Sequence, residues 1–290
     1  MKHSQTEPIA IYGIVGYPVK HSLSPRMHNA AFEAMQIEAV YKLFELKEDE
    51  LDKFFTDLRS PASPIFGLNV TVPYKEKILE YVDSLSPFAE KARAVNTIVI
   101  TDKRHLQGHN TDGSGFLAHL IEMGFDTADK RIAILGAGGT TRAILTALSL
   151  LPERPDSIRI YNRTRANAEQ LVADLAKRMD MGNVKVVDHL EDLNIELADL
   201  LINTTSVGLK SDDSCLVNEE ELHAGLLVYD VVYQPNGTAL LKAAKERGAR
   251  CANGLGMLYY QGVLALEHWV GIILPEDIKA LMRRSLEGKP

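Results

Sequence analysis

The sequence has little cysteine, no long apolar run and no excess of positive charge. Its two cysteines, Cys215 and Cys251, stand in unrelated contexts, so they indicate neither a disulfide framework nor a zinc site and favour a reducing compartment. No apolar run approaches the roughly 18 residues that suggest a membrane helix. The short run near the N-terminus leads into Gly16-Tyr17-Pro18, not into a small-residue cleavage site. We expect a cytoplasmic protein without a membrane partner.

The charge balance argues against a nucleic-acid partner. The chain carries 32 basic and 39 acidic residues, a formal net charge of −7, whereas a nucleic-acid binder is more often basic. Its nine histidines show no spacing typical of metal ligands, so no metal site is predicted. A content of 46% hydrophobic and 24% charged residues is typical of a globular protein, and 290 residues suffice for two domains. Nothing in the sequence decides between a monomer and a homodimer.

Hydrophobic patterning predicts an α/β fold. In the first part of the chain, strands alternate with helices, which indicates a mainly parallel sheet, and a polar turn after Thr101 indicates one hairpin. The expected strands are Ile9–Val15, Val40–Leu46, Gly67–Val72, Val95–Thr101 and His105–His109, and the expected helices are Pro25–Met35, Glu48–Arg59 and Lys75–Tyr81.

A second unit is predicted after a helical segment near Ser114–Met123. It has six expected strands, the number found in two mononucleotide-binding halves. They are Arg131–Leu135, Ser157–Tyr161, Val184–Val187, Asp199–Ile202, Leu226–Val231 and Ala249–Ala252.

From about Gly254 the pattern is helical again, with helices expected over Met257–Val270 and Pro275–Leu286. We expect one α/β domain over residues 1–113 and a Rossmann-type domain over 114–252. The helices of 253–290 should return to the first domain, and the active site is expected in the cleft between the domains.

The segment Gly136-Ala137-Gly138-Gly139-Thr140 joins a buried strand to an apolar helix over Ala143–Leu151. Small residues let a backbone approach a pyrophosphate, and the helix N-terminus offers N–H groups, so this context favours a dinucleotide site over a plain tight turn. The match is imperfect, because the third glycine of the usual pattern falls on Thr141.

The stretch Asn162-Arg163-Thr164-Arg165 lies 26 positions after Gly136. An NAD site usually has Asp or Glu here to bind the ribose 2′-hydroxyl, whereas guanidinium groups suit a 2′-phosphate. Asn162 and Thr164 offer neighbouring hydrogen-bonding groups. The pattern favours NADP over NAD, the alternative being an exposed basic turn.

Apolar and polar side chains alternate along Gly67–Val72, the period of a strand, and Pro73 should end the ladder just before Lys75. Lys75 and Asp112 could form an acid/base pair, although each alone could be a plain helix-end residue. We favour the pair because Lys75, Asn96 and Asp112 follow expected strand ends of one domain. The apolar face of the strand is expected to contain Leu68, Val70 and Val72, and the polar face Asn69 and Thr71.

Ser22 and Ser24 are two residues apart, so in extended backbone their hydroxyls would project to one side and could bind a carboxylate. Ser24-Pro25 also fits the N-cap and first position of a helix, and both readings can hold. The histidines His21, His28 and His119 are expected at the surface or behind the site.

Taken together, these motifs resemble the shikimate dehydrogenase family, in family order over nearly the whole chain. The resemblance implies reversible, NADP-linked reduction of 3-dehydroshikimate to shikimate in aromatic amino-acid biosynthesis, with Lys75 and Asp112 as the catalytic pair. The matching pieces are Ser22-Leu23-Ser24-Pro25, Asn69 to Lys75, Ala94-Val95-Asn96-Thr97, Asn110-Thr111-Asp112-Gly113, Gly136-Ala137-Gly138-Gly139, Asn162-Arg163-Thr164, and Gly254-Leu255-Gly256-Met257 with Gln261.

The resemblance also implies roles for further residues. Ser22 and Ser24 would hold the substrate carboxylate with Tyr233 nearby, and Thr71, Asn96, Asp112 and Gln261 would contact the ring hydroxyls. The nicotinamide and adenine pockets would be lined by Thr204, Thr205, Ser206, Val207, Val231, Gly254 and Met257.

The chain departs from the family at Asn167, where a second basic residue is common, with Arg165 as the nearest substitute. Two alternatives remain. One is a quinate or dual quinate/shikimate dehydrogenase using NAD or NADP, which the intact serine pair weakly disfavours. The other is a non-catalytic ligand sensor, which the intact Lys75/Asp112 pair disfavours.

Overall fold

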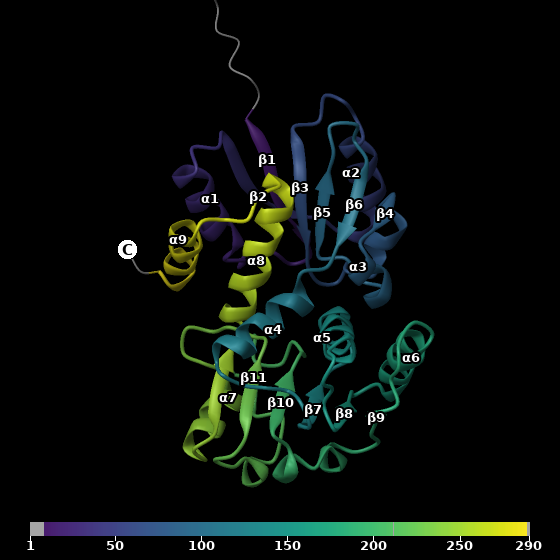
Figure 1. Cartoon of the computed structure of the whole chain (residues 1–290), viewed down its shortest axis with the longest axis vertical. Coiled ribbons are helices and arrows are strands. Elements are labelled where there is room, and N and C mark those ends of the chain that lie inside the picture. The colour runs from purple at the N-terminus through teal and green to yellow at the C-terminus, as the bar shows by residue number, and fades with distance from the viewer. Residues whose placement is uncertain (1–8, 211, 289–290) are drawn as a thin grey trace, which may run out of the picture. The chain divides into compact units, whose positions relative to one another are not determined.

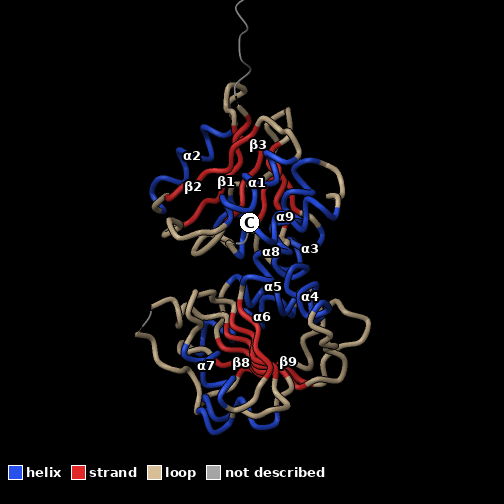
Figure 2. Tube along the Cα trace, turned by 90° about the vertical axis from the view of Figure 1, so that its left-hand side faces the viewer, coloured by secondary structure: helices blue, strands red, loops and turns tan. Residues whose placement is uncertain are grey.

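The computed structural model describes residues 9–210 and 212–288 of the chain. The chain divides into two compact units, with boundaries between Thr111 and Asp112 and between Tyr260 and Gln261. The first unit is therefore built from two separate stretches of sequence, and the second from the single stretch between them. Each unit contains one sheet covered by helices (Figures 1 and 2).

The sheet of the first unit has the strand order β2-β1-β3-β5-β6-β4 within the described residues. Only the pairs β3–β5 and β5–β6 are antiparallel, so β5 alone runs against the other strands, and the predicted hairpin after Thr101 is confirmed. The strands are β1 (Ala10–Gly16), β2 (Ala39–Glu45), β3 (Ile65–Val70), β4 (Ser84–Leu85), β5 (Thr97–Ile100) and β6 (Leu106–His109).

The C-terminal helices return to the first unit, as predicted. Trp269 of α8 (Leu255–Val270) donates its indole N–H to Ile98 O at 3.0 Å, and its ring occupies the space that a side chain at Gly67 would need. The last helix, α9 (Glu276–Glu287), packs against α1 (Ser24–Ala34). Two shorter helices, α2 (Leu51–Leu58) and α3 (Pro87–Ala92), complete the unit (Figure 1).

Two local predictions in this unit are wrong. The expected α-helix Lys75–Tyr81 is only a 3₁₀ turn over Lys77–Glu80, because the chain must begin β4 four residues later. The strand expected to reach Val72 ends at Val70, and Val72 is 58% exposed instead of lying on the apolar face with Leu68.

A buried histidine lies in the core of the first unit. His28 of α1 is completely buried, with its ring stacked on Tyr41 at 4.5 Å and tilted against Trp269 at 5.2 Å. Within the described residues neither of its ring nitrogens has a hydrogen-bond partner, and burial lowers its pKa to about 3. Of the two positions expected for His28, the surface is wrong, because the residue is buried on the apolar face of α1, whereas a position behind the site stays a prediction.

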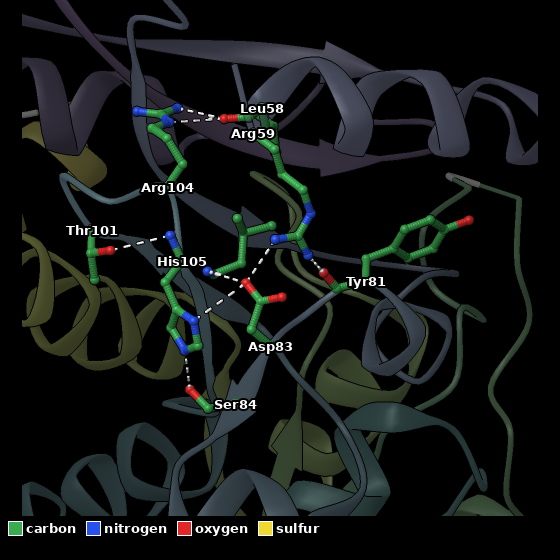
Figure 3. Close-up of polar contacts among 9 residues, drawn as sticks. Leu58, Arg59, Tyr81, Asp83, Ser84, Thr101, Arg104 and His105 are labelled. Atoms are coloured by element: carbon green, nitrogen blue, oxygen red, sulfur yellow. Dashed lines mark hydrogen bonds and ion pairs between the residues drawn. The ribbon is translucent and has the colours of Figure 1, made fainter. Parts of the chain in front are cut away.

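Polar groups fasten the β5–β6 turn to the rest of the first unit (Figure 3). Arg104 is buried and donates from Nε and Nη2 to Leu58 O at 2.9 and 2.7 Å. Nearby, the Asp83 carboxylate accepts from Arg59 Nη1 and from Leu106 N, both at 2.8 Å. The Arg59 hydrogen bond is the largest cause of the lowered pKa of Asp83.

The sheet of the second unit is parallel throughout its described pairs, with strand order β12-β11-β10-β7-β8-β9. This is the doubly wound order of a Rossmann-type fold, and it reverses between β7 and β10. The predicted six strands are confirmed as β7 (Arg131–Leu135), β8 (Ser157–Tyr161), β9 (Val184–Val186), β10 (Leu200–Asn203), β11 (Leu227–Asp230) and β12 (Arg250–Asn253).

Helices cover this second sheet (Figures 1 and 2). They are α4 (Asp112–Glu122), α5 (Gly139–Ser149), α6 (Arg165–Ala176) and α7 (Ala239–Glu246), and α8 begins in this unit. Strands buried on both faces need nearly continuous apolar sequence, which is what Arg131–Leu135 supplies. In the part of the chain that is described, no helix combines the length and the apolar character needed to cross a bilayer.

Candidate active site

A buried amide lies at the centre of the first unit's polar cluster. Asn96 directly precedes β5 and is 2% exposed. Its Nδ2 donates to Thr111 Oγ1 at 3.0 Å and to Gln261 Oε1 at 3.3 Å, and its Oδ1 accepts from Thr111 N at 2.8 Å. Asn96 and Gln261, two predicted site residues 165 positions apart, are therefore brought together.

A further layer of polar groups supports this cluster. Asn69, which was expected on the polar face of its strand, is only 4% exposed. Its Nδ2 donates to Asn96 O and to Thr97 Oγ1, both at 3.2 Å, and its Oδ1 accepts from Tyr41 OH at 2.7 Å. Tyr41 could not be found from local sequence, because its partner lies on another strand.

Ser22 and Ser24 lie where the chain enters α1, but not in the expected extended backbone. Leu23 between them is in the α-helical region, and Ser24 N donates to Ser22 Oγ at 3.3 Å. Ser24 is the first residue of α1 and is 2% exposed, so the prediction that it is the N-cap is wrong by one residue. Ser22 is half-buried.

Backbone hydrogen bonds tie the Lys75 segment to the start of β5. Lys75 O accepts from Val95 N at 2.7 Å, so half-buried Lys75 is held one residue from Asn96. The turn that leads to it is closed by Tyr74 N donating to Thr71 O at 2.9 Å. Asp112 directly follows Thr111, begins α4 and is 5% exposed. The pairing of Lys75 with Asp112 stays a prediction.

In the second unit the glycine segment forms the turn between β7 and α5. Gly136 has φ +105°, a conformation that favours glycine, and a Cβ there would lie 2.5 Å from Thr204 Oγ1. Gly138 is the N-cap of α5, and a Cβ at this position would meet no atom within 4 Å. A turn that is open on one side at a helix N-terminus suits a pyrophosphate. Of the other predicted residues, Ala137 lies in this turn, and Gly139 and Thr140 are the first two residues of α5.

Thr141 stands at the position of the usual third glycine and closes the same turn. It is completely buried, and its Oγ1 lies 3.1 Å from Gly136 O and 2.7 Å from Thr204 Oγ1. Thr204 in turn donates to Leu135 O at 2.7 Å. The departure from the glycine pattern therefore adds hydrogen bonds inside the loop.

The stretch expected to bind a 2′-phosphate forms the turn between β8 and α6. Asn162 Nδ2 donates to Thr164 O at 2.7 Å, Arg163 is exposed, and Arg165 is the first residue of α6. Arg165 forms ion pairs with Glu169 and Asp188. The two arginines therefore differ in their surroundings, which the sequence did not indicate.

A buried polar cluster that the sequence did not indicate lies at the carboxyl ends of β10 and β11. Asp230 is completely buried and accepts from Asn203 Nδ2 at 2.9 Å and from Thr238 Oγ1 at 2.6 Å. Burial raises the pKa of Asp230, against the opposing effect of these hydrogen bonds. Asn203 Oδ1 accepts from Thr205 N at 3.0 Å, which fixes the turn that continues with Ser206.

The remaining predicted residues lie around the start of α8. Met257 is 6% exposed and belongs to the apolar core of the second unit, where Val231 packs against it. Gly254 lies so close to Val231 O that a side chain would overlap it, and half-buried Tyr233 is next to the same glycine.

The fold and the polar cluster together define a class of protein. The second unit has the strand order and the glycine turn of a dinucleotide-binding domain, and the first unit gathers amides and hydroxyls at strand ends. This combination is typical of two-domain nicotinamide-dependent oxidoreductases.

Comparison with known proteins identifies the family. Residues 14–98 match the shikimate dehydrogenase substrate binding domain, and residues 119–225 match the shikimate / quinate 5-dehydrogenase model. Over 289 residues, covering 98% of this chain and 97% of the relative, the sequence is 41% identical to the shikimate dehydrogenase (NADP(+)) of Symbiobacterium thermophilum. The chain belongs to the shikimate dehydrogenase family, which confirms the resemblance seen in its motifs.

Solved structures agree with this assignment. The shikimate dehydrogenase of Aquifex aeolicus superimposes with a TM-score of 0.85 at 36% identity, covering 99% of each chain. The shikimate 5-dehydrogenase of Listeria monocytogenes, solved in complex with shikimate and NAD, gives a TM-score of 0.83 at 37% identity, covering 97% of this chain and 99% of that one.

Proposed function

We propose that this protein catalyses the reversible, NADP-dependent reduction of 3-dehydroshikimate to shikimate, in the cytoplasm. The observation that carries the proposal is the Asn96–Thr111–Gln261 cluster beside the Lys75 segment, in a chain of this family. Amides and hydroxyls fixed at strand ends suit a ligand with several hydroxyl groups. The relative from Symbiobacterium thermophilum is named for NADP(+), and exposed Arg163 supports the same cofactor here.

The substrate roles follow the family motifs. In the proposal, residues 1–113 bind the substrate, residues 114–252 bind NADP, and residues 253–290 complete the first domain. Ser22 and Ser24 bind the carboxylate with Tyr233 nearby. The ring hydroxyls contact Thr71, Asn96, Asp112 and Gln261.

Lys75 and Asp112 are the proposed acid/base pair. NADP supplies or accepts the hydride, so the protein has to orient the substrate and move one proton. During reduction the ketone oxygen gains negative charge, which the Lys75 ammonium stabilises before it donates a proton to that oxygen. Asp112 accepts hydrogen bonds from the substrate hydroxyl and from the ammonium, and so keeps both in place. In the oxidative direction the same pair receives the hydroxyl proton.

The glycine turn and the buried cluster after β10 are the proposed cofactor contacts. Gly136, Gly138 and the N-terminus of α5 would hold the pyrophosphate, and Thr204 and Thr205 would line the adjacent pocket. Asn162, Arg163 and Thr164 would bind the ribose and its phosphate. The openness of the backbone at Gly138 supports this fit.

The reaction is tested by initial rates with shikimate and quinate, each with NADP⁺ and NAD⁺, following reduced nicotinamide by absorbance. Turnover with shikimate and NADP⁺ alone supports the proposal. Comparable turnover with quinate or NAD⁺ identifies the alternative, a dual quinate/shikimate dehydrogenase. The matching family model is described for both substrates. No turnover with any pair would refute catalysis and favour a ligand sensor.

The acid/base pair is tested by Lys75→Ala. Turnover should fall by about 10²–10⁴-fold, the usual contribution of a positioned acid/base group, while shikimate binding changes by a modest factor. Lys103→Ala removes an exposed lysine of the same unit and is the matched control. Near-normal turnover in Lys75→Ala would remove Lys75 from the mechanism.

A further inference from the structure

Arg165 occupies a position suited to a 2′-phosphate but is already bound by two carboxylates. Its Nε donates to Glu169 Oε1 at 2.7 Å, and its Nη1 donates to Asp188 Oδ1. Glu169 lies one turn further along α6, and Asp188 follows β9. Because β8 and β9 are parallel neighbours, their carboxyl ends bring Asp188 to the turn that carries Arg163 and Arg165.

The charged groups around Arg165 differ from those around Arg163. One guanidinium lies between two carboxylates, so the trio of Arg165, Glu169 and Asp188 carries a net negative charge at neutral pH. Arg163, two residues earlier, is exposed, and within the described residues its guanidinium has no hydrogen-bond or ion-pair partner. An arginine binds phosphate through the same fork of N–H groups that binds carboxylate, so carboxylate and phosphate compete for Arg165.

We propose that Asp188 and Glu169 bind Arg165 in competition with a cofactor 2′-phosphate and thereby set the preference between NADP and NAD. The inference rests on the proposed cofactor function. While the two carboxylates occupy its N–H groups, Arg165 adds little to the binding of a 2′-phosphate, whereas NAD has only a neutral 2′-hydroxyl there and does not need this arginine. Arg163 is then the cation that favours NADP, and the carboxylates limit that preference.

The experiment measures dissociation constants of NADP⁺ and NAD⁺, and kcat/KM with shikimate, for the full-length protein and its variants. In Asp188→Asn, the Nη1 edge of Arg165 becomes available while Glu169 still orients Nε. The preference for NADP⁺ over NAD⁺ should rise about tenfold, the effect of one charge-assisted hydrogen bond. Glu169→Gln should raise the same ratio by a smaller factor.

A double-mutant cycle isolates the part played by Arg165. Arg165→Ala should change the ratio by at most about twofold in the native background, but should abolish the gain in the Asp188→Asn background. Glu153→Gln is the matched charge control. It removes one exposed negative charge before the amino end of β8, roughly 17 Å of strand from Arg163, and should leave the ratio unchanged.

Each outcome decides one point. An unchanged ratio in Asp188→Asn would overturn the proposal, and so would a gain that persists without Arg165, because it would then be a general charge effect. A shift in the two dissociation constants without any shikimate turnover would leave this inference standing and refute the proposed reaction.

Discussion

Replacing the buried histidine His28 should make the first unit less sensitive to acid. The His28 ring is enclosed by the Tyr41 and Trp269 rings, and burial lowers its pKa from an ordinary 6.5 to about 3. The unfolded chain therefore binds a proton at this site below pH 6.5, whereas the folded chain does not until about pH 3. Because folding lowers the pKa of His28, the folded state keeps its full stability above pH 6.5 and loses part of it as the pH falls from 6.5 towards 3.

The size of the effect follows from these two values. At pH 5 nearly all unfolded molecules carry the proton on His28 and about 1% of folded molecules do, which removes about 2 kcal/mol of stability relative to pH 8. His28→Phe keeps an aromatic ring on Tyr41 but cannot bind a proton. Its packing cost is the same at both pH values, so it cancels in the comparison.

The assay is urea unfolding followed by the fluorescence of Trp269, the one tryptophan of the sequence, whose ring centroid lies 5.2 Å from that of His28. Between pH 8 and pH 5 the free energy of unfolding should fall by about 2 kcal/mol less in His28→Phe than in the native protein. Half-buried His109, with a pKa lowered to about 4, remains in both proteins, so its contribution cancels in the difference. His21→Gln, at an exposed site, is the control.

Equal losses in the native protein and in His28→Phe would refute the reasoning, because His28 would then titrate alike in the folded and unfolded chain. A larger loss in the variant would mean that His28 is held in its charged form.

Two further substitutions test the packing of the first unit. Gly67→Ala places a methyl group where the Trp269 indole lies, so it should cost about 1–3 kcal/mol of stability in urea unfolding, and Trp269→Phe in the same chain should recover part of the loss. Asp83→Asn removes a carboxylate whose pKa is lowered chiefly by Arg59, so it should cost about 1 kcal/mol at pH 7. A carboxyl group whose pKa is lowered by folding stabilises the fold at pH values above its pKa in the unfolded chain. The difference in stability between Asp83→Asn and the native protein should therefore disappear as the pH falls below about 4. A gap that is constant with pH would contradict the ion-pair account.

The six strands of the second sheet could be predicted because a buried strand is marked by local sequence. Apolar runs between Gly, Pro and polar turns mark buried strands, and a glycine turn after the first strand identifies the sheet. Strand ends share an edge, so Asn96 could be placed near Lys75 without coordinates.

The surroundings of individual side chains could not be predicted, because they depend on partners far along the chain. Asn69 alternates with apolar residues, yet its amide is buried by Tyr41, 28 positions away. His28 is polar, yet it lies on the apolar face of α1. The Asp188 carboxylate that binds Arg165 comes from the next strand. A local pattern says which face a residue occupies, but it does not say what covers that face.

The division of the chain has a consequence for the order in which it can fold during synthesis. The first unit is left at Thr111 and re-entered at Gln261, and both residues hydrogen-bond to the same amide of Asn96. The Trp269 ring over Gly67 and the packing of α9 on α1 both use residues that are synthesised after the whole of the second unit. The later, uninterrupted unit is complete before then. In this chain the unit whose synthesis begins first is therefore completed last, the reverse of the usual order in which domains fold during translation.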